Sequence, residues 1–411
     1  MGGSYLWGRG YLDPIPSDKS TGYLLRASGS LKRTDLIDFQ TKKIGAEFMA
    51  RLTTLEDMMI AGEDVVFPYT DFLKDEVRDA EKVQMGKSRL ISASCLEYVI
   101  LWRRYYGRFT AAVVKTRIDS GMALGINPLL EADRVVTRFS EIDGGGFLAG
   151  DFSGYDVSQQ AQITSHILKY QRAWLRFGVD TPLGVERVRR TLANNLINSV
   201  HVNGFNGKEA VAVKNTLYFW TMSMPSGHPA TTVVNCMYNL FAFAYAYGKL
   251  VGDGCFHDNV RMIVYGDDNV VKVSDAVADA FTQPEIARAL IDGLGLVYTN
   301  EDKDGTTAVL RTLSEVSFLK RRFVESHDGG YVMQLSLDSV NKALCWASSA
   351  DTMEQTVLNQ LYELAFHERE VWSNYINHLR MFGACPEGVS ADYDGQATYR
   401  SLALKKSFNY A

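Results

Sequence analysis

The order of apolar and polar positions along the chain predicts short strands that alternate with longer helices. Apolar residues that recur every three or four positions predict helices over residues 96–106, 159–177, 231–247 and most of 351–379. Short apolar runs bounded by turn residues predict strands within residues 65–94, 147–152, 195–212, 260–273 and 315–323. The first 35 residues are rich in Pro, Ser and Gly, which is typical of an irregular surface segment. We therefore expect an α+β fold with a helical C-terminal part.

Acidic residues stand where the predicted strands end. Asp151 lies at the end of the apolar run 147–152, and Asp267 and Asp268 form the tip of a hairpin within 260–273. A Gly-Asp-Asp turn is by itself equally typical of a polar hairpin, but apolar residues flank this one on both sides. Carboxylates that gather in one place repel each other unless a cation neutralises them, and Mg²⁺ prefers such oxygen ligands. The pattern favours phosphoryl transfer with two ions about 3.5–4 Å apart.

A second group of polar residues follows at a regular spacing. Asp156 lies five residues after the first acid, in a predicted turn. Ser226 and Gly227 form a loop that precedes a predicted helix, where the backbone can approach a ligand closely. Thr231 and Asn235 are four residues apart and share one face of that helix, although such residues also commonly cap or pack helices. Asp156, Ser226 and Asn235 are therefore candidates for a hydrogen-bond network that reads a ribose hydroxyl.

Composition and charge restrict the possible partners and compartments. The chain has 43 Lys and Arg against 48 Asp and Glu, a formal charge of −5, so a nucleic acid would need a local basic surface. Residues 71–117 supply one, with ten basic against six acidic side chains, although such a run is also typical of a solvated face. Five scattered cysteines without CxxC spacing argue against a disulfide scaffold or a cysteine zinc site. No apolar run reaches the roughly 18–20 residues of a membrane span, so we expect a soluble, intracellular protein.

These motifs, taken in order, resemble those of viral RNA-dependent RNA polymerases, in particular the picornavirus-like group of positive-strand RNA viruses. Motifs A, B and C are similar to Asp151-x4-Asp156, Ser226-Gly-x3-Thr231-x3-Asn235 and Tyr265-Gly-Asp-Asp268. Ser20-Thr-Gly-Tyr23 resembles motif G, and the segments 73–78 and 82–91 resemble motif F. Asn300-Glu-Asp-Lys303 resembles motif D, and Phe318-Leu-Lys-Arg321 resembles motif E. Trp346 and the helical stretch after it resemble the thumb of this group. The similarity extends over about residues 20–380.

The resemblance implies a role for each motif residue. Two Mg²⁺ or Mn²⁺ ions would be bound by Asp151, Asp267 and Asp268. Lys303, an ordinary surface lysine by its local pattern, would complete the catalytic set as the proton donor to pyrophosphate. The incoming ribonucleoside triphosphate would be held by Lys74, Arg78, Lys82, Arg89, Asp156, Ser226, Thr231 and Asn235. RNA would be contacted by Ser20, Thr21, Gly22, Tyr23, Gly227, Lys320 and Arg321.

The resemblance also implies a right-hand polymerase architecture of fingers, palm and thumb, with an antiparallel palm sheet and a helical thumb. The implied division is fingers at 1–105, palm at 106–205, a fingers insertion at 206–224, palm at 225–325 and thumb at 326–411. RNA template and primer and ribonucleoside triphosphates would be the partners, together with a protein primer and other viral replication proteins. The expected location is the host cytoplasm, at viral replication complexes.

Three alternatives differ from this interpretation in single features. A reverse transcriptase would carry a bulky aromatic residue where this chain has Asp156. An inactive RNA-binding scaffold would lack a metal acid, and a metal-dependent nuclease would not need the block at 226–235. Two departures from the family pattern stand out: only 19 residues precede Ser20, and His228-Pro229 occupies a loop that usually contains small residues. We expect Pro229 to stiffen that loop.

Overall fold

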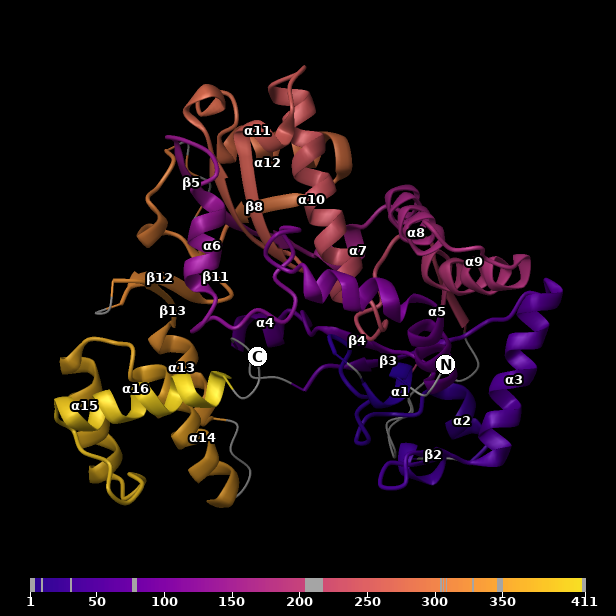
Figure 1. The fold of residues 1–411 in the computed structure, drawn as a ribbon, viewed down its shortest axis with the longest axis horizontal. Helices are drawn as coiled ribbons and strands as arrows, with labels where there is room; N and C mark the ends of the chain where they lie inside the picture. The colour runs from indigo at the N-terminus through magenta and orange to yellow at the C-terminus, as the bar shows by residue number, and fades with distance from the viewer. Residues whose placement is uncertain are drawn as a thin grey trace. The chain divides into compact units, whose positions relative to one another are not determined.

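The computed structural model describes residues 4–8, 10–29, 32–75, 80–203, 217–303, 305, 307, 309–326, 329–345 and 350–408 (Figure 1). The chain forms two compact units. Unit 1 comprises Met1–Leu124, Phe152–Ala242 and Leu290–Val297, and unit 2 comprises Gly125–Asp151, Phe243–Ala289 and Tyr298–Ala411. The five-part division expected from the sequence stays a prediction.

Unit 1 contains a four-stranded sheet in the order β4-β3-β6-β7. β3 pairs antiparallel with β4 and parallel with β6, and β6 pairs antiparallel with β7. Helices α3, α5, α8 and α9 pack against one another. The elements are α1 (Ser4–Trp7), α2 (Tyr23–Ala27), a 3₁₀ turn (Arg33–Asp35), β1 (Ile37–Asp38), β2 (Lys43–Ile44), α3 (Ala46–Ala61), β3 (Tyr69–Leu73), α4 (Ala80–Gln84), β4 (Leu90–Ala93), α5 (Leu96–Lys115), α7 (Tyr155–Ser158), α8 (Ala161–Arg176), α9 (Leu183–Ile197), β6 (Ser199–Asn203) and β7 (Leu217–Trp220).

Unit 2 contains a four-stranded sheet in the order β10-β5-β9-β8 and a three-stranded sheet β11-β12-β13. Most positions of β8 and β9 are buried, including consecutive residues that point to opposite faces, which is typical of strands covered on both faces. The elements are α6 (Ala132–Phe139), β5 (Gly146–Ser153), α11 (Phe256–Asn259), β8 (Val260–Tyr265), β9 (Asp268–Val273), two 3₁₀ turns (Asp275–Val277 and Leu313–Glu315), β10 (Val297–Asn300), β11 (Ser317–Phe318), β12 (Arg321–Glu325) and β13 (Tyr331–Leu335). Along the chain, β5, β10, α10 (Thr231–Leu250) and α12 (Gln283–Leu294) pass from one unit into the other.

The C-terminal part of unit 2 is helical, as predicted. It consists of α13 (Leu337–Leu344), α14 (Ala350–Leu364), α15 (Arg369–Met381) and α16 (Tyr393–Phe408), drawn from orange to yellow in Figure 1. Leu361, Trp372 and Ile376 form their shared core and are fully buried. Among the described residues, no helix is both long and apolar enough to span a bilayer.

Most of the predicted elements are confirmed, with shifted ends. The hairpin at 260–273 is β8 and β9, and the helix predicted at 159–177 is α8. The helix predicted from 96 continues to Lys115, and the one predicted over 351–379 is two helices, α14 and α15. The hairpin predicted within 195–212 has its second strand later, at β7, and residues 204–216 lie outside the described ones. Helices α3, α6, α9 and α12 were not predicted.

A buried hydrogen-bond relay joins the segment before α10 to the core of unit 1. Ala230 N–H donates to His228 Nδ1 at 3.0 Å, so the proton of the neutral imidazole is on Nε2. His228 Nε2 lies 3.1 Å from the Tyr98 hydroxyl, which donates to the Leu192 carbonyl oxygen at 2.9 Å. The Trp102 ring packs edge-on against the imidazole with centroids 4.3 Å apart. The relay satisfies every polar atom of a histidine that apolar rings enclose.

Protonation of His228 should therefore destabilise the protein. Burial lowers the pKa of His228 from 6.5 to about 3, so below about pH 6.5 the unfolded chain takes up a proton that the folded chain does not. Stability should fall by about 1.4 kcal/mol per pH unit from this residue alone as the pH drops below that value. We expect the melting temperature of His228→Gln to fall less steeply than that of the wild type as the pH is lowered from about 7 to about 4.

The matched control is His166→Gln, which removes an exposed histidine of α8 in the same unit. It should leave the acid side of the profile as steep as in the wild type. A wild-type slope in His228→Gln would contradict a neutral imidazole in the folded state.

Candidate active site

Strand pairing brings the three predicted metal acids to one end of the unit 2 sheet. Tyr265 pairs with Asp268 across a two-residue turn in which Gly266 has a φ of 65°, a value that favours glycine. Gly150 of β5 pairs with Asn269, so Asp151 is the next residue along β5 at that end. The predicted hairpin with its acids at the tip is confirmed, and the strand register sets Asp151 beside it.

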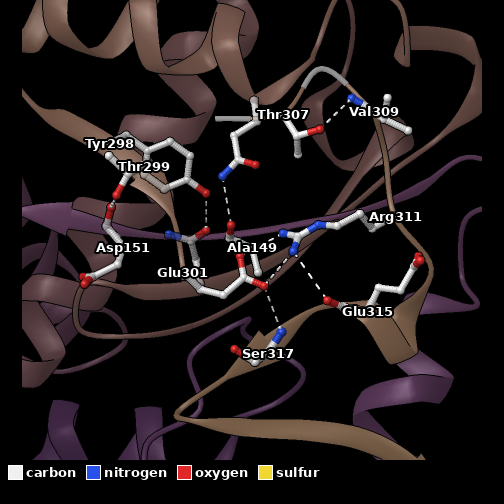
Figure 2. A network of polar contacts seen from close by, with 12 residues as sticks. Ala149, Asp151, Tyr298, Thr299, Glu301, Thr307, Val309, Arg311, Glu315 and Ser317 are labelled. Carbon is white, nitrogen blue, oxygen red and sulfur yellow. Dashed lines mark hydrogen bonds and ion pairs between the residues drawn. The ribbon is translucent and has the colours of Figure 1, made fainter. Parts of the chain in front are cut away.

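Buried side chains hold these strands together immediately behind the acids. The Tyr298 hydroxyl donates to Asn269 Oδ1 at 2.8 Å, and Gln283 Nε2 donates to the Ala149 carbonyl oxygen at 2.9 Å. The Thr299 hydroxyl donates to the backbone oxygen of Asp151 at 3.5 Å (Figure 2). A Cβ atom at Gly150 would lie 2.3 Å from the Tyr298 ring, so only glycine allows β10 this close to β5. The backbone of the acidic end is therefore fixed by buried contacts.

The carboxylates repel each other at close range. Burial and, after it, the charges of Asp267 and Asp151 raise the pKa of Asp268 to about 7, and the charges of Lys320 and Lys303 oppose this rise. Asp268 is only partly exposed, so water offers it little compensation. The cluster has a surplus of negative charge that the two lysines offset incompletely.

Lys303 is in direct contact with this cluster. Its ammonium lies 2.6 Å from Asp151 Oδ2, and its backbone has a φ of 61°, which is uncommon for a residue with a side chain. The loop that carries it is fixed nearby by Glu301, which forms a two-pronged ion pair with Arg311 at 2.8–2.9 Å and accepts from Ser317 N–H at 3.1 Å (Figure 2). The structure thus brings Lys303 to the acids, and its role as a proton donor stays a prediction.

The chemistry of this donor set fits a hard divalent cation. All three side chains offer carboxylate oxygens, and Asp151 already forms an ion pair with the ammonium of Lys303. Among the residues that the structure describes, no group of three or more His, Cys, Asp or Glu side chains is arranged to hold a metal ion as it stands. A metal bound by Asp151, Asp267 and Asp268 would therefore require these side chains to turn toward it.

In unit 1, the structure brings two predicted ribose-reading residues together. Asn235 Nδ2 donates to Asp156 Oδ1 at 2.9 Å, and Asn235 is buried on α10. Burial raises the pKa of Asp156, whereas the hydrogen bond from Asn235 and the charge of Arg89 lower it. Gln159, which was not predicted, donates from Nε2 to Asn235 Oδ1 at 2.7 Å. The side chain of Asn235 thus bonds a carboxylate and an amide.

The loop before α10 is anchored to β4. Ser92 N–H donates to the Ser226 hydroxyl at 3.0 Å, and Gly227 N–H donates to the Ser92 carbonyl oxygen at 3.0 Å. A Cβ atom at Gly227 would lie 2.4 Å from that oxygen, so glycine is required for the close approach. Thr231 Oγ1 lies 2.8 Å from the His228 carbonyl oxygen and donates back into the loop. Ser226 and Thr231 therefore shape the loop, and among these described residues no hydrogen bond joins the side chain of either one to the side chain of Asn235 or Asp156.

Three residues predicted to bind the triphosphate, Lys74, Lys82 and Arg89, lie on the β3–β4 hairpin, between its two strands. Lys74 N–H donates to the Arg89 carbonyl oxygen at 2.8 Å, and both side chains are exposed. The charge of Arg89 acts on Asp156, so the basic hairpin and the ribose-reading pair belong to one region of unit 1. Lys82 is in α4, but its side chain is not described, and Arg78 lies outside the described residues.

The predicted RNA-contacting segment at Ser20–Tyr23 packs on the start of α5. Thr21 is fully buried, and its carbonyl oxygen accepts from Leu96 N–H at 2.9 Å. Gly22 has a φ of 84°, and a Cβ there would lie 2.5 Å from the Cys95 backbone. Gly22 is thus fixed by a close approach, and Ser20 is the exposed residue before it.

Lys320 and Arg321 lie on the β11–β12 hairpin and differ in their surroundings. Lys320 is exposed and its charge acts on Asp268. Arg321 forms a two-pronged ion pair with Glu363 at 2.7–2.8 Å and donates to the Met333 carbonyl oxygen. Arg321 links β12 to α14 through these bonds, so its predicted contact with RNA stays a prediction. Trp346 lies outside the described residues.

Comparison with known proteins agrees with this arrangement. The family model for viral RNA-dependent RNA polymerase matches residues 8–383. The replicase polyprotein of Cricket paralysis virus is 32% identical over 349 residues, which cover 79% of this chain and 19% of the polyprotein. The replicase polyprotein of Acute bee paralysis virus is 29% identical over 361 residues, which cover 83% of this chain and 18% of the polyprotein. The chain therefore spans about a fifth of the length of these relatives.

A solved structure shares the fold. The Sicinivirus 3Dpol RNA dependent RNA polymerase has a TM-score of 0.79 and 19% sequence identity to this protein, over 98% of this chain and 80% of that one. This confirms the predicted α+β right-hand fold, and the family model confirms the predicted family. The chain belongs to the viral RNA-dependent RNA polymerase family.

Proposed function

We propose that this chain synthesises RNA from ribonucleoside triphosphates on an RNA template by two-metal nucleotidyl transfer, and so replicates a viral RNA genome. The observation that carries the proposal is the group of three mutually repelling carboxylates at the end of the unit 2 sheet, with the pKa of Asp268 raised to about 7. A surplus of negative charge on oxygen donors is what a pair of divalent cations neutralises. Family membership supports polymerisation as the reaction that uses them.

Asp151, Asp267 and Asp268 would hold two Mg²⁺ or Mn²⁺ ions, which stabilise charge on the attacking and leaving oxygens when bound. The three side chains would orient the ions. The buried hydrogen bonds that hold β5, β9 and β10 would keep the backbone of these acids in a fixed position. Lys303 would donate a proton to the departing pyrophosphate. Its contact with Asp151 at 2.6 Å shows that its ammonium reaches the acids.

The remaining predicted residues would bind nucleotide and RNA. Lys74, Arg78, Lys82 and Arg89 would neutralise the triphosphate, since guanidinium and ammonium groups bind phosphate oxygens strongly. Asp156 and Asn235 would read the ribose hydroxyl, with Ser226 and Thr231 shaping the adjoining loop. The residues proposed to contact RNA are Ser20, Thr21, Gly22, Tyr23, Gly227, Lys320 and Arg321.

Partners and location follow from the proposed reaction. Template and primer RNA and ribonucleoside triphosphates are the proposed substrates. The relatives are polyproteins, which supports a protein primer and other viral replication proteins as further partners. The proposed location is the host cytoplasm, at viral replication complexes. No disulfide joins the five cysteines, all of which lie in described segments.

Loss of a metal acid should abolish nucleotide incorporation. We expect Asp267→Asn to reduce primer extension on a homopolymer RNA by at least about a hundredfold, because the substitution removes one of the charges that hold the ions. The matched control is Asp279→Asn, an exposed carboxylate of the same unit, which should extend primer at the wild-type rate. Near-normal extension by Asp267→Asn and Asp151→Asn would show that the two-metal assignment is wrong.

Sugar selection should depend on Asn235. Asn235→Ala removes the amide that bonds Asp156, so the preference for ATP over dATP should narrow by at least about two- to tenfold, which is the worth of one neutral hydrogen bond, since a bond to an ionised Asp156 is worth more. The ratio of kcat/KM values for the two nucleotides measures this effect, and a thermal melt monitors folding. A lowered melting temperature with an unchanged ratio would mean that Asn235 only packs its helix.

A further inference from the structure

Gln159 lies in the extended turn between α7 and α8 and is almost completely buried, with 1% of its surface exposed. Its Nε2 donates to Asn235 Oδ1 at 2.7 Å, a shorter distance than the 2.9 Å of the neighbouring bond from Asn235 to Asp156. Its own Oε1 is buried and has no hydrogen-bond partner among the described residues. A buried acceptor without a partner is costly, so packing alone would favour an apolar side chain here.

The bond from Gln159 and the bond to Asp156 favour the same orientation of the Asn235 amide. An amide has one acceptor end and one donor end, and rotation by half a turn exchanges them. With Gln159 donating to Oδ1, the Nδ2 donors of Asn235 face Asp156. After rotation, two donors would meet at Gln159 and two acceptors at Asp156.

Asp156 cannot guarantee this orientation by itself during catalysis. Its carboxylate accepts the bond from Asn235 at Oδ1 and has further acceptor sites, so a ribose hydroxyl that donates to the same carboxylate would draw part of its interaction away from Asn235. Gln159 bonds the opposite end of the amide, so it keeps Asn235 facing Asp156 while the carboxylate changes partners.

The backbone around Gln159 is held by other groups. The Tyr155 hydroxyl donates to the Asn235 carbonyl oxygen at 2.9 Å, and Gln160 N–H donates to the Tyr238 hydroxyl at 2.9 Å. These bonds fasten α7 and the turn after it to α10 without the Gln159 side chain. Replacement of that side chain should therefore leave the position of the Asp156 backbone unchanged.

We infer that Gln159 is a positioning residue for sugar selection, which acts by holding the Asn235 amide with its donors toward Asp156. The inference rests on the proposed function, because it assumes that Asp156 and Asn235 read the ribose. It assigns specificity to a residue outside the polymerase motifs that the sequence displays. Gln159→Leu removes the donor and keeps the bulk, whereas Gln159→Glu offers only acceptors when ionised and favours the rotated amide.

The experiment measures kcat and KM for matched ATP and dATP with the full chain, together with thermal melts. Gln159→Leu should narrow the ratio of the two kcat/KM values by roughly two- to tenfold, and Gln159→Glu by at least as much. The melting temperature of Gln159→Leu should stay close to wild type, because one unpaired buried acceptor replaces another. Gln162→Leu, three residues away and exposed, is the matched control and should keep the wild-type ratio.

A double-mutant cycle with Asn235→Ala distinguishes the role inferred for Gln159 from the proposed ribose pocket. Gln159 acts through Asn235, so Gln159→Leu should add no further loss of discrimination in the Asn235→Ala background. An altered ratio in Asn235→Ala with a wild-type ratio in Gln159→Leu would overturn the inference and leave the ribose pocket standing. An equal loss from Gln159→Leu in both backgrounds would also overturn it. A wild-type ratio in Asn235→Ala would reject the ribose pocket itself, and the inference with it.

Discussion

Asp151, Asp267 and Asp268 carry like charges at one end of the β10-β5-β9-β8 sheet, where burial withholds much of the water that would otherwise stabilise them. Such an arrangement persists only if the surrounding structure prevents the strands from moving apart. The bonds from Tyr298 to Asn269 and from Gln283 to Ala149 serve this purpose, because the first joins β10 to β9 and the second joins α12 to β5, directly behind the acids. The ion pair of Glu301 with Arg311 fixes the loop from which Lys303 reaches Asp151.

A different physical problem is solved in unit 1, where neutral donors and acceptors must face the correct way. The amide of Asn235 is bonded at both ends, and the imidazole of His228 is bonded at both nitrogens. In each case a buried group has a single orientation in which all of its bonds are satisfied. Gly227 adds a third constraint, because its backbone lies against β4 where a side chain would collide. The loop before α10 is thus held in place by the core of unit 1.

The sequence was most informative where a short motif fixes local geometry. The Gly-Asp-Asp hairpin was predicted correctly because apolar strands flank a turn that needs a glycine, and the loop before α10 because a Pro-Ser-Gly sequence cannot continue a strand. Helices α3 and α9 were missed, since their apolar stripes are weak and mixed with charges. The stiffening of this loop by Pro229 stays a prediction; what the sequence did not indicate is that Ser92 and Tyr98, both distant in sequence, hydrogen-bond to the loop.

The supporting residues of both sites were equally hard to predict. Gln159, Tyr298, Asn269 and Arg311 belong to no motif, and their roles arise from partners that lie 10 to 76 residues away. Gln159 alone offers a signal for its role, because a buried position between two helices is ordinarily occupied by an apolar residue. The ion pair of Arg321 with Glu363 could not be anticipated, because it joins two elements whose contact the sequence does not reveal.

The central claim is that Asp151, Asp267 and Asp268 hold divalent cations, and direct metal binding tests it independently of catalysis. Titration of the protein with Mn²⁺, with the unbound ion followed by electron paramagnetic resonance, gives the number and affinity of sites in the presence of a nucleotide that cannot be incorporated. The account predicts two ions per chain in the wild type and loss of at least one in both Asp151→Asn and Asp267→Asn. Wild-type stoichiometry and affinity in both variants would contradict it.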